Sequence, residues 1–275
     1  MWTKNGAETL PFVLKQISEV TPTEFVNKRV IVDDRSTDDT TEIAESFGWD
    51  VVLNEGKGIS DGANTALKHV TSDCFASFEQ DLLLAREWWQ KIPKHLSDPK
   101  VAIASGLRLP SQPVALREIE EFSIERYQRG EKDVESFLCG KTLDNTIYKT
   151  RIIRQIGGFP KISISAGVDN VLAMRIRLNQ FEWKVDYTVK STHLRKGLKD
   201  ELVHYYWYGT CSDTLSPLLF RRYADIRPLI LRLFFSPMRG LHIAIKKKTP
   251  QAVYVYPLIR LVGLKGIFDG RKRMM

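Results

Sequence analysis

Two groups of acidic residues have the types and the spacing that could bind a cation and a nucleotide. Asp33 and Asp34 end one apolar run of the chain, and Glu79 and Asp81 end another. Two carboxylates that are two residues apart can share a hard divalent cation, which prefers oxygen ligands and can bridge a diphosphate. A carboxylate at a strand end can instead accept hydrogen bonds from a base, and the next helix N-terminus favours anions. Each group, taken singly, is also explained by a helix cap or by solvated loop acids.

The elements that must position these acids alternate along the first part of the chain. Compact apolar runs typical of buried strands are followed by helical patterns of about ten residues. The predicted strands are residues 26–34, 50–54, 74–81 and 101–109, and the first two predicted helices are residues 36–48 and 59–70. Such alternation predicts an α/β fold with a mainly parallel central sheet flanked by helices. Ligands bind at the carboxyl ends of such strands, so we expect the two acidic groups to share one crevice.

The second part of the chain has a different character. It predicts a charged surface helix at residues 112–132, a strand with irregular flanks at 137–149 and a further helix at 168–178. Two apolar segments with single interleaved cations follow at 217–235 and 253–268. Proline interrupts a helix because it lacks a backbone N–H, so we expect four prolines to divide the apolar segments into short helices. These prolines are Pro228, Pro237, Pro250 and Pro257.

Composition and charge exclude several classes of protein. The 275 residues suit one large α/β domain or one domain plus an appendage, and the three scattered cysteines form no zinc motif, so a reducing compartment is expected. Residues 221–275 carry thirteen Lys and Arg against two acids, a net +11, while the whole chain is +8 and residues 1–220 are therefore −3. A nucleic-acid-binding body would carry its own basic stripe, so no nucleic-acid partner is expected. No signal peptide is evident, and no apolar run reaches the roughly 18 residues of a membrane-spanning helix.

Several motifs in order resemble family 2 glycosyltransferases with the GT-A fold. Residues 3–10 read TKNGAETL and are similar to the opening T-x-N-E-x-x-x-L of that family. Residues 30–40 read VIVDDRSTDDT, close to V-V-D-D-G-S-T-D-x-T, and residues 54–67 read NEGKGISDGANTAL, like the stretch N-x-G-x-S-x-G-x-N-x-G. The triplet at residues 79–81 falls where the family has D-x-D, and Gly157, Gly158 and Phe159 fall at its G-G-F. The likeness covers residues 3 to about 209, and this combination of motifs is specific although each motif alone is weak.

The resemblance implies a role for each matching residue. On the nucleotide-sugar side it implies Asn5, Asp33, Asp34, Lys57, Asn64, Glu79 and Gln80. It implies that Asp81 ligates Mg²⁺ or Mn²⁺, with Glu79 in support and His193 near the metal. Asp169 would be the base that deprotonates the acceptor hydroxyl, which gives direct displacement with inversion. No Q-x-x-R-W motif follows Asp169, so transfer of a single sugar from a UDP- or GDP-linked donor to a hydroxyl acceptor is expected.

The chain also departs from the family pattern at four positions. Gly6 replaces the opening Glu, Arg35 replaces a Gly, Glu79 begins the metal triplet, and Val168 replaces the Glu of E-D. These departures keep open a non-catalytic relative that binds nucleotide sugars. A sugar nucleotidyltransferase is a further alternative, although it would carry a glycine-rich basic loop after the first strand.

The basic tail predicts how the chain meets its surroundings. We expect a catalytic domain at residues 1–209 and a basic helical extension at residues 210–275. Apolar segments with interleaved cations suit the plane of an anionic bilayer surface, which predicts a cytoplasmic protein peripheral to the inner face of the cell membrane. A lipid-linked acceptor fits that location. Alternatively, the extension packs on the catalytic domain or on a second copy in a homodimer.

Overall fold

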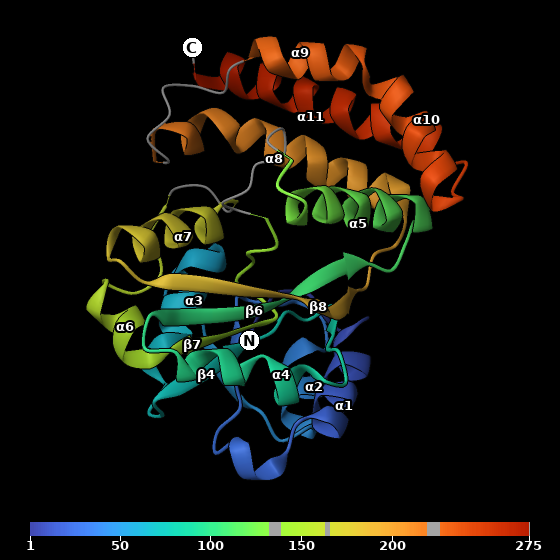
Figure 1. Ribbon diagram of the computed structural model, residues 1–275. Coiled ribbons are helices and arrows are strands. Elements are labelled where there is room, and N and C mark those ends of the chain that lie inside the picture. The colour runs from blue at the N-terminus through green and yellow to red at the C-terminus, as the bar shows by residue number, and fades with distance from the viewer. Residues whose placement is uncertain (132–138, 163–165, 219–225, 275) are drawn as a thin grey trace. The chain divides into compact units, whose positions relative to one another are not determined.

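The computed structural model describes residues 1–131, 139–162, 166–218 and 226–274. Its contacts divide the chain into two compact units. Unit 1 consists of Met1–Arg108 and Gly140–Leu194. Unit 2 consists of Leu109–Cys139 and Arg195–Met275. This division differs from the boundary expected at 209/210, because one helix continues unbroken through those residues. The expected elements at 112–132, 137–149 and 217–235 extend into residues that are not described. Figure 1 shows the elements of both units in chain order.

Unit 1 begins with a parallel sheet in the order β1-β2-β3. Its strands are β1 (Trp2–Thr3), β2 (Val30–Asp33) and β3 (Asp50–Leu53). The register places Asp33, at the carboxyl end of β2, opposite Thr3 and Leu53. The segments that connect or follow these strands form α1 (Leu10–Val20), η1 (Thr23–Phe25), α2 (Thr40–Ser46) and α3 (Gly58–Lys68). These are the alternating units that the sequence predicts, and the α/β fold class is confirmed.

A second sheet of five strands has the order β4-β7-β6-β8-β5. Its strands are β4 (Cys74–Ser77), β5 (Leu82–Leu83), β6 (Val101–Pro110), β7 (Thr146–Lys149) and β8 (Glu182–His193). The β4–β7, β6–β7 and β5–β8 pairs are antiparallel, so the second sheet adds antiparallel pairs to the mainly parallel arrangement expected from the sequence. The strand expected at 74–81 ends at Ser77, and the acidic triplet lies in the connection from β4 to β5.

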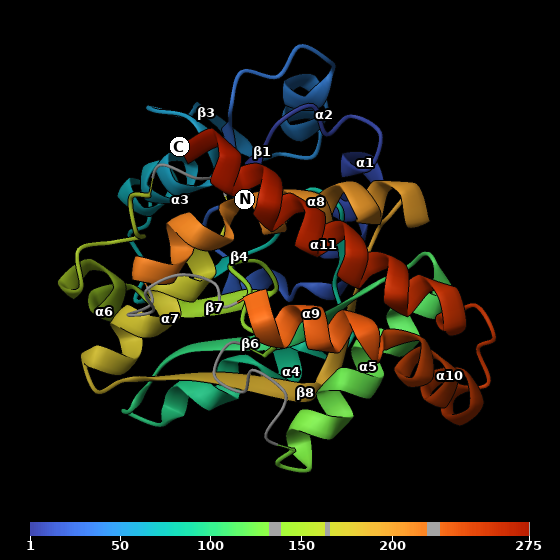
Figure 2. The ribbon, with the colours of Figure 1, turned by 90° about the horizontal axis from the view of Figure 1, so that it is seen from above.

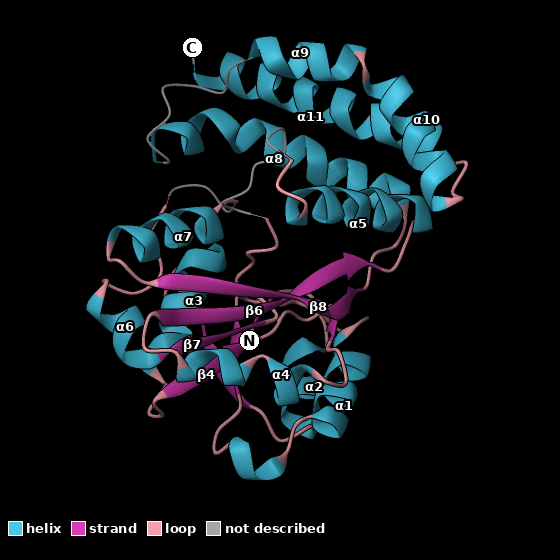
Figure 3. Cartoon of the chain, in the orientation of Figure 1, coloured by secondary structure: helices cyan, strands magenta, loops and turns pink. Residues whose placement is uncertain are grey.

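The remaining helices of unit 1 lie around these strands (Figure 3). They are α4 (Trp88–Lys91), η2 (Pro93–Ser97), α6 (Thr150–Gln155) and α7 (Val168–Leu178). A continuous apolar core joins α1, the strands and α4, and its fully buried members include Leu10, Leu14, Ile31, Leu82 and Trp88. This core holds rigid the strand ends that carry the acidic residues.

Apart from the last two residues of β6, the described elements of unit 2 are helices. Its helices are α5 (Val114–Gln128), α8 (Leu198–Leu218), α9 (Ile226–Phe234), α10 (Ser236–Lys247) and α11 (Ala252–Met274). The surface helix expected at 112–132 is amphipathic, because α5 buries Leu116, Ile119 and Phe122 against α10 and α11. Figure 2 shows α9 running beside α11.

Glycines allow α8 and α11 to approach each other closely. A Cβ atom on Gly266 would overlap the carbonyl oxygen of Tyr206, and one on Gly209 would overlap the carbonyl oxygen of Gly263. The two backbones therefore touch where larger side chains would hold them apart. At the C-terminal end of α11, Arg271 forms an ion pair with the buried carboxylate of Asp213 on α8.

The prolines of the tail divide it less than expected. Pro228 lies in the first turn of α9, Pro237 lies in the first turn of α10, and Pro250 lies between α10 and α11. Pro257 was expected to end a helix, but it lies inside the 23-residue α11. A proline there removes one backbone hydrogen bond. Packing of α11 on α8 and α10 supplies the stability that this bond would have given.

Among the described helices, none combines the length and the apolar character needed to cross a bilayer.

Candidate functional site

Three side chains that can ligate a metal ion meet in unit 1. Glu79 and Asp81 come from the connection between β4 and β5, and His193 is the last residue of β8. Pairing of β5 with β8 sets Leu82 opposite His193, and the Leu194 backbone N–H donates to the Asp81 carbonyl at 2.7 Å. One ligand atom from each of the three side chains lies within 4.8 Å of the others. Backbone pairing therefore positions the cluster before any ion is present.

The chemistry of this cluster suits a divalent cation. His193 Nε2 lies 3.1 Å from Asp81 Oδ2 and 3.5 Å from Glu79 Oε2. The imidazole is buried, whereas both carboxylates keep about a fifth of their surface exposed, at 23% for Glu79 and 22% for Asp81. Carboxylates are ligands that Mn²⁺ and Mg²⁺ sites use, an imidazole is a common ligand of transition metals, and the exposed carboxylate edges leave room for a substrate oxygen. The residues present fit a metal ion.

An ion pair between half-buried Arg108 and buried Asp144 lies beside the cluster, and neither residue was predicted from the sequence. The Arg108 guanidinium, near the end of β6, donates to Glu79 Oε2 at 2.9 Å. The same nitrogen lies 3.5 Å from Asp144 Oδ1, whose side chain is 1% exposed. Arg108 therefore links a candidate metal ligand to a buried acid. Its only sequence signal is a single charge within the otherwise apolar run at 101–109.

Asp169, the candidate base, lies in the first turn of α7. The helix follows Gly167, whose φ of 84° is in the left-handed region that favours glycine. The side chain keeps some contact with solvent, but surrounding protein removes enough water that burial raises the pKa of Asp169 to about 6. A hydrogen bond from the Asn170 N–H and the charge of Arg108 oppose this rise, while the charge of Asp144 adds to it.

Burial and the same acids raise the pKa of a tyrosine, Tyr148. Burial raises the pKa of Tyr148, and the negative charges of Asp144, Asp169 and Glu79 raise it further. The Tyr148 hydroxyl donates to the Leu143 carbonyl at 2.6 Å. The candidate base and the candidate metal cluster thus belong to one electrostatic environment.

The paired aspartates after β2 organise the backbone around them. Asp33 is buried and accepts a hydrogen bond from the Ser36 N–H at 2.9 Å. Asp34 accepts from the Gly58 N–H at 3.1 Å, and its carboxylate lies 3.7 Å from the Lys4 ammonium. Both carboxylates are therefore held in place by neighbouring donors.

Asn5 and Gln80 bind the loops beside these acids. Asn5 has a φ of 49° and accepts from the Thr37 N–H at 2.9 Å. Gln80 accepts from the Lys4 N–H at 3.0 Å and from the Thr3 hydroxyl, and it donates to the Lys4 carbonyl at 3.2 Å. Because Lys4 contacts both Asp34 and Gln80, the structure brings the paired aspartates close to the acidic triplet.

Lys57 and Asn64 are placed differently from each other. Lys57 is exposed at the start of α3, where its backbone N–H donates to Asp61 at 2.9 Å. Asn64 donates to the Phe159 carbonyl and accepts from the Phe159 N–H, both at 3.0 Å. Its side chain therefore fastens α3 to the segment after Gly158.

Arg35, which replaces a glycine of the family pattern, fits the loop after β2. It has a φ of 62°, a conformation that favours glycine. Its guanidinium donates to the carbonyls of Gly56 at 2.8 Å and Asn54 at 3.3 Å. These hydrogen bonds offset the strain and connect the loop to the segment before α3.

A cavity of about 200 Å³ lies elsewhere in unit 1, among the first residues of β1, β2 and β4. Met1, Val30, Trp49, Cys74 and Phe159 are among the residues that line it. None of the predicted site residues lines this cavity, so its size does not point to the chemistry.

The fold is of the α/β class, and the clustered side chains could hold a metal ion. The family profile described as Glycosyl transferase family 2 matches residues 1–156, more than half of the chain. The chain therefore belongs to glycosyltransferase family 2 and is a glycosyltransferase. A search of curated proteins finds no match.

Solved structures show the same fold. A mannosyltransferase from Pyrobaculum calidifontis, in complex with GDP-Man and Mn²⁺, matches 99% of this chain and 84% of its own, at 18% identity and a TM-score of 0.66. Glucosyl-3-phosphoglycerate synthase from Mycobacterium tuberculosis, in complex with Mn²⁺, UDP-Glc and phosphoglyceric acid, matches 79% of this chain and 77% of its own. Its identity is 14% and its TM-score is 0.57. The GT-A fold expected from the sequence is confirmed.

Proposed function

We propose that this glycosyltransferase moves a single sugar from a UDP- or GDP-linked donor to a hydroxyl acceptor, with inversion and with Mn²⁺ or Mg²⁺. The observation that carries the proposal is the convergence of Glu79, Asp81 and His193 within 4.8 Å. The two solved structures above, each in complex with Mn²⁺ and a nucleotide sugar, support it. A bound ion would neutralise charge on the departing diphosphate.

Asp169 supplies the acid–base chemistry in this proposal. The acceptor oxygen attacks the anomeric carbon and forms the new glycosidic bond, while the bond from that carbon to the diphosphate oxygen breaks. The acceptor proton moves to the Asp169 carboxylate, and the nucleoside diphosphate leaves with the electron pair. A pKa of about 6 suits this role, because the group is ionised at neutral pH yet basic enough to accept a proton.

The nucleotide side of the site consists of residues that already order the surrounding loops. Asp33 or Asp34 accepts hydrogen bonds from the base, with Lys57 near the diphosphate and Asn5 and Gln80 shaping the loop edge. Asn64 contributes from α3, through the segment after Gly158 that it fastens. The hydrogen bonds to the Asp34 carboxylate hold it ready for a base without a further change of loop conformation.

The metal site is tested by Asp81→Asn, which keeps the shape of the side chain and removes its charge. Thermal shifts with UDP and GDP, with and without Mn²⁺, report nucleotide binding through ligand stabilisation. We expect the Mn²⁺-dependent part of the shift to disappear in this variant. Unchanged Mn²⁺ enhancement would contradict the assignment.

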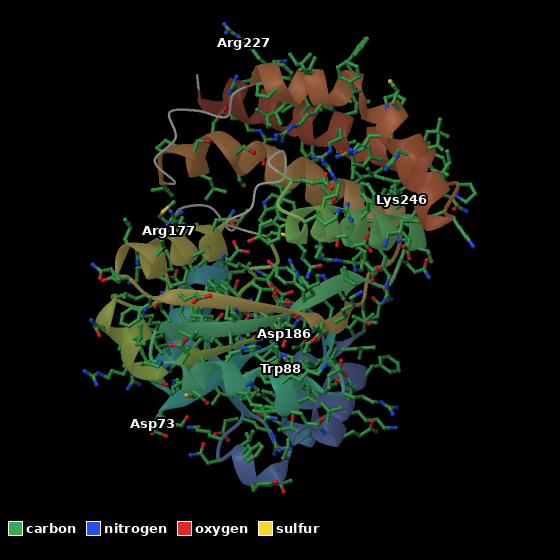
Figure 4. The ribbon with its side chains drawn as sticks, in the orientation of Figure 1. Asp73, Trp88, Arg177, Asp186, Arg227 and Lys246 are labelled. Atoms are coloured by element: carbon green, nitrogen blue, oxygen red, sulfur yellow. The ribbon has the colours of Figure 1, made fainter. Side chains whose placement is uncertain are left out.

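The chain offers a matched control in a second Asp–His pair. Asp186 of β8 lies 3.0 Å from His95, and it is labelled in Figure 4. Asp186→Asn makes the same change of charge next to an imidazole but outside the cluster. It should leave the Mn²⁺ effect intact, which separates metal binding from a general effect on stability.

The basic extension, residues 210–275, is proposed to hold the protein against an anionic membrane at its cytoplasmic face. The charge distribution supports this location, since the net +11 of residues 221–275 contrasts with −3 for the rest of the chain. A lipid-linked hydroxyl acceptor fits such a position. The homodimer alternative predicts instead that the same surface buries a second copy.

A further inference from the structure

One row of large apolar side chains follows α9 and α10 in unit 2. Leu231 and Phe234 of α9, then Met238, Leu241 and Ile245 of α10, recur at alternating intervals of three and four residues, so within each helix they lie along one side. Their exposed fractions are 59%, 75%, 70%, 51% and 72%. We call these five residues the apolar stripe. The chain around them is helical, so the row is a fixed feature of the surface.

Two backbone hydrogen bonds span the junction of the two helices. The Phe235 N–H donates to the Leu231 carbonyl at 3.1 Å, and the Arg239 N–H donates to the Phe235 carbonyl at 3.1 Å. The helices change direction at this junction (Figure 1). The 3–4 spacing nevertheless continues from one helix into the other.

Packing within unit 2 fixes which side of α10 faces outward. The residues Gly240, Ile243 and Ala244 are buried, and Ile243 and Ala244 belong to the core shared with α5 and α11. A Cβ atom on Gly240 would lie 2.7 Å from the Ala252 carbonyl oxygen, so this side of α10 presses against α11. The apolar stripe cannot turn inward without breaking that packing.

The stretch of chain that carries the stripe bears charges of only one sign, although acids of α5 contact Lys247. Residues 226–268 contain eight Lys and Arg and no Asp or Glu. Lys247 is held by acids of α5, its ammonium lying 2.6 Å from Glu125 and 3.8 Å from both Glu118 and Glu121. Four other cations are exposed along α9 and α10: Arg227, Arg232, Lys246 and Lys248. Arg227 points away from the ribbon in Figure 4.

We propose that the apolar stripe inserts into the headgroup region of an anionic bilayer while the surrounding cations meet lipid phosphates. This inference rests on the proposed membrane contact and assigns it to α9 and α10. A second copy seated on the stripe would bring the same cations against each other with no acid in residues 226–268 to neutralise them, whereas anionic lipid neutralises them directly. Amphipathic helices with apolar and cationic side chains in this arrangement lie in the plane of a membrane surface.

Substitution within the stripe tests the proposal. Leu231→Ser with Phe234→Ser removes two stripe residues without altering charge. The matched control is Leu178→Ser with Phe12→Ser, since Leu178 is 62% exposed and Phe12 is 66% exposed in unit 1. All four side chains are more than half exposed, so neither double variant should unfold the protein.

Sedimentation with vesicles measures the effect. The vesicles contain phosphatidylcholine alone, or phosphatidylcholine with about a third replaced by phosphatidylglycerol. We expect the stripe variant to lose about 100-fold in partitioning to the anionic vesicles, about tenfold for each large apolar side chain withdrawn from lipid. The control should stay within about twofold of the unaltered protein.

The possible outcomes separate the two proposals. If the unaltered protein binds anionic vesicles and both variants bind equally well, the assignment of the membrane contact to the apolar stripe is wrong, and another surface makes the contact. If the unaltered protein binds no vesicles, the membrane contact itself is refuted. If the stripe variant alters only self-association, measured as mass in solution, the occupant is a second copy and the proposal fails. Thermal shifts with GDP or UDP and Mn²⁺ should be equal in all variants. This control shows that the substitutions change membrane binding and leave nucleotide binding unaltered.

Discussion

The raised pKa of Asp169 predicts that the candidate base destabilises the fold it serves. The difference between the ordinary pKa of 3.8 and the value of about 6 corresponds to ~3 kcal/mol, at about 1.4 kcal/mol per pKa unit. Because the side chain keeps some contact with solvent, we expect about 1–3 kcal/mol. Asp169→Asn removes the buried charge, so it should raise the free energy of unfolding by this amount at pH 8.

The pH dependence gives this prediction its sign. Below the unfolded-state pKa of 3.8 the carboxyl is protonated in both states, and it costs no stability. As the pH rises from about 4 to about 6, the unfolded state loses its proton first, and the folded state loses stability. The advantage of Asp169→Asn should therefore be absent near pH 3.8 and complete above about pH 6.5.

The assay is thermal unfolding of the metal-free protein, in chelator, across this pH range. A gain of about 1–3 kcal/mol corresponds to an increase in Tm of several degrees, at about 2–4 °C per kcal/mol for a protein of this size. Donor hydrolysis by the same variant should fall by about 10² to 10⁴ in kcat, with donor affinity nearly kept. A variant that is less stable at pH 8, or whose stability difference does not change with pH, would refute the reasoning.

Two further predictions concern an ion pair and a helix contact. Arg108→Met should lower the free energy of unfolding by about 2 kcal/mol, because the buried Asp144 carboxylate loses the guanidinium beside it. Adding Asp144→Asn should recover most of the loss in urea unfolding, and no recovery would show that the two residues are uncoupled. Gly266→Ala should destabilise by about 1–3 kcal/mol through overlap with a backbone carbonyl of α8. Gly263→Ala, whose Cβ would lie 3.8 Å from its nearest neighbour, should be neutral or stabilise by up to about 1 kcal/mol, and equal Tm changes would contradict this contact.

Strands β2 and β3 were predictable because each is a short apolar run that ends in polar residues. β2 ends at Asp33, one residue before the predicted end, and the helical patterns after β2 and β3 became α2 and α3. The second sheet was less accessible, because its antiparallel pairs join segments far apart in sequence. Pairing of β5 with β8 places Leu82 opposite His193, and the local sequence pattern of either strand does not indicate which distant strand it pairs with.

The candidate site was predictable where a motif marks it and unpredictable where tertiary packing creates it. The structure brings Glu79, Asp81 and His193 together, as the family resemblance implies. Arg108 and Asp144 belong to no motif, and their interaction depends on the fold bringing together residues that are 36 positions apart. Continuity of α11 through Pro257 was missed for a related reason, because contacts with other helices outweigh a local propensity.

The contact between Gly6 and Gln80 restricts how this sequence can change over evolutionary time. A Cβ at position 6 would lie 2.7 Å from Gln80 Oε1 and 3.0 Å from the Thr3 hydroxyl oxygen. Gln80 cannot simply move aside, because Thr3 and Lys4 hold its amide through hydrogen bonds. The glutamate of the family pattern at position 6 would therefore require Gln80 to give up these hydrogen bonds and shift. Two positions 74 residues apart are coupled in this way, so the effect of a substitution at one depends on the residue at the other.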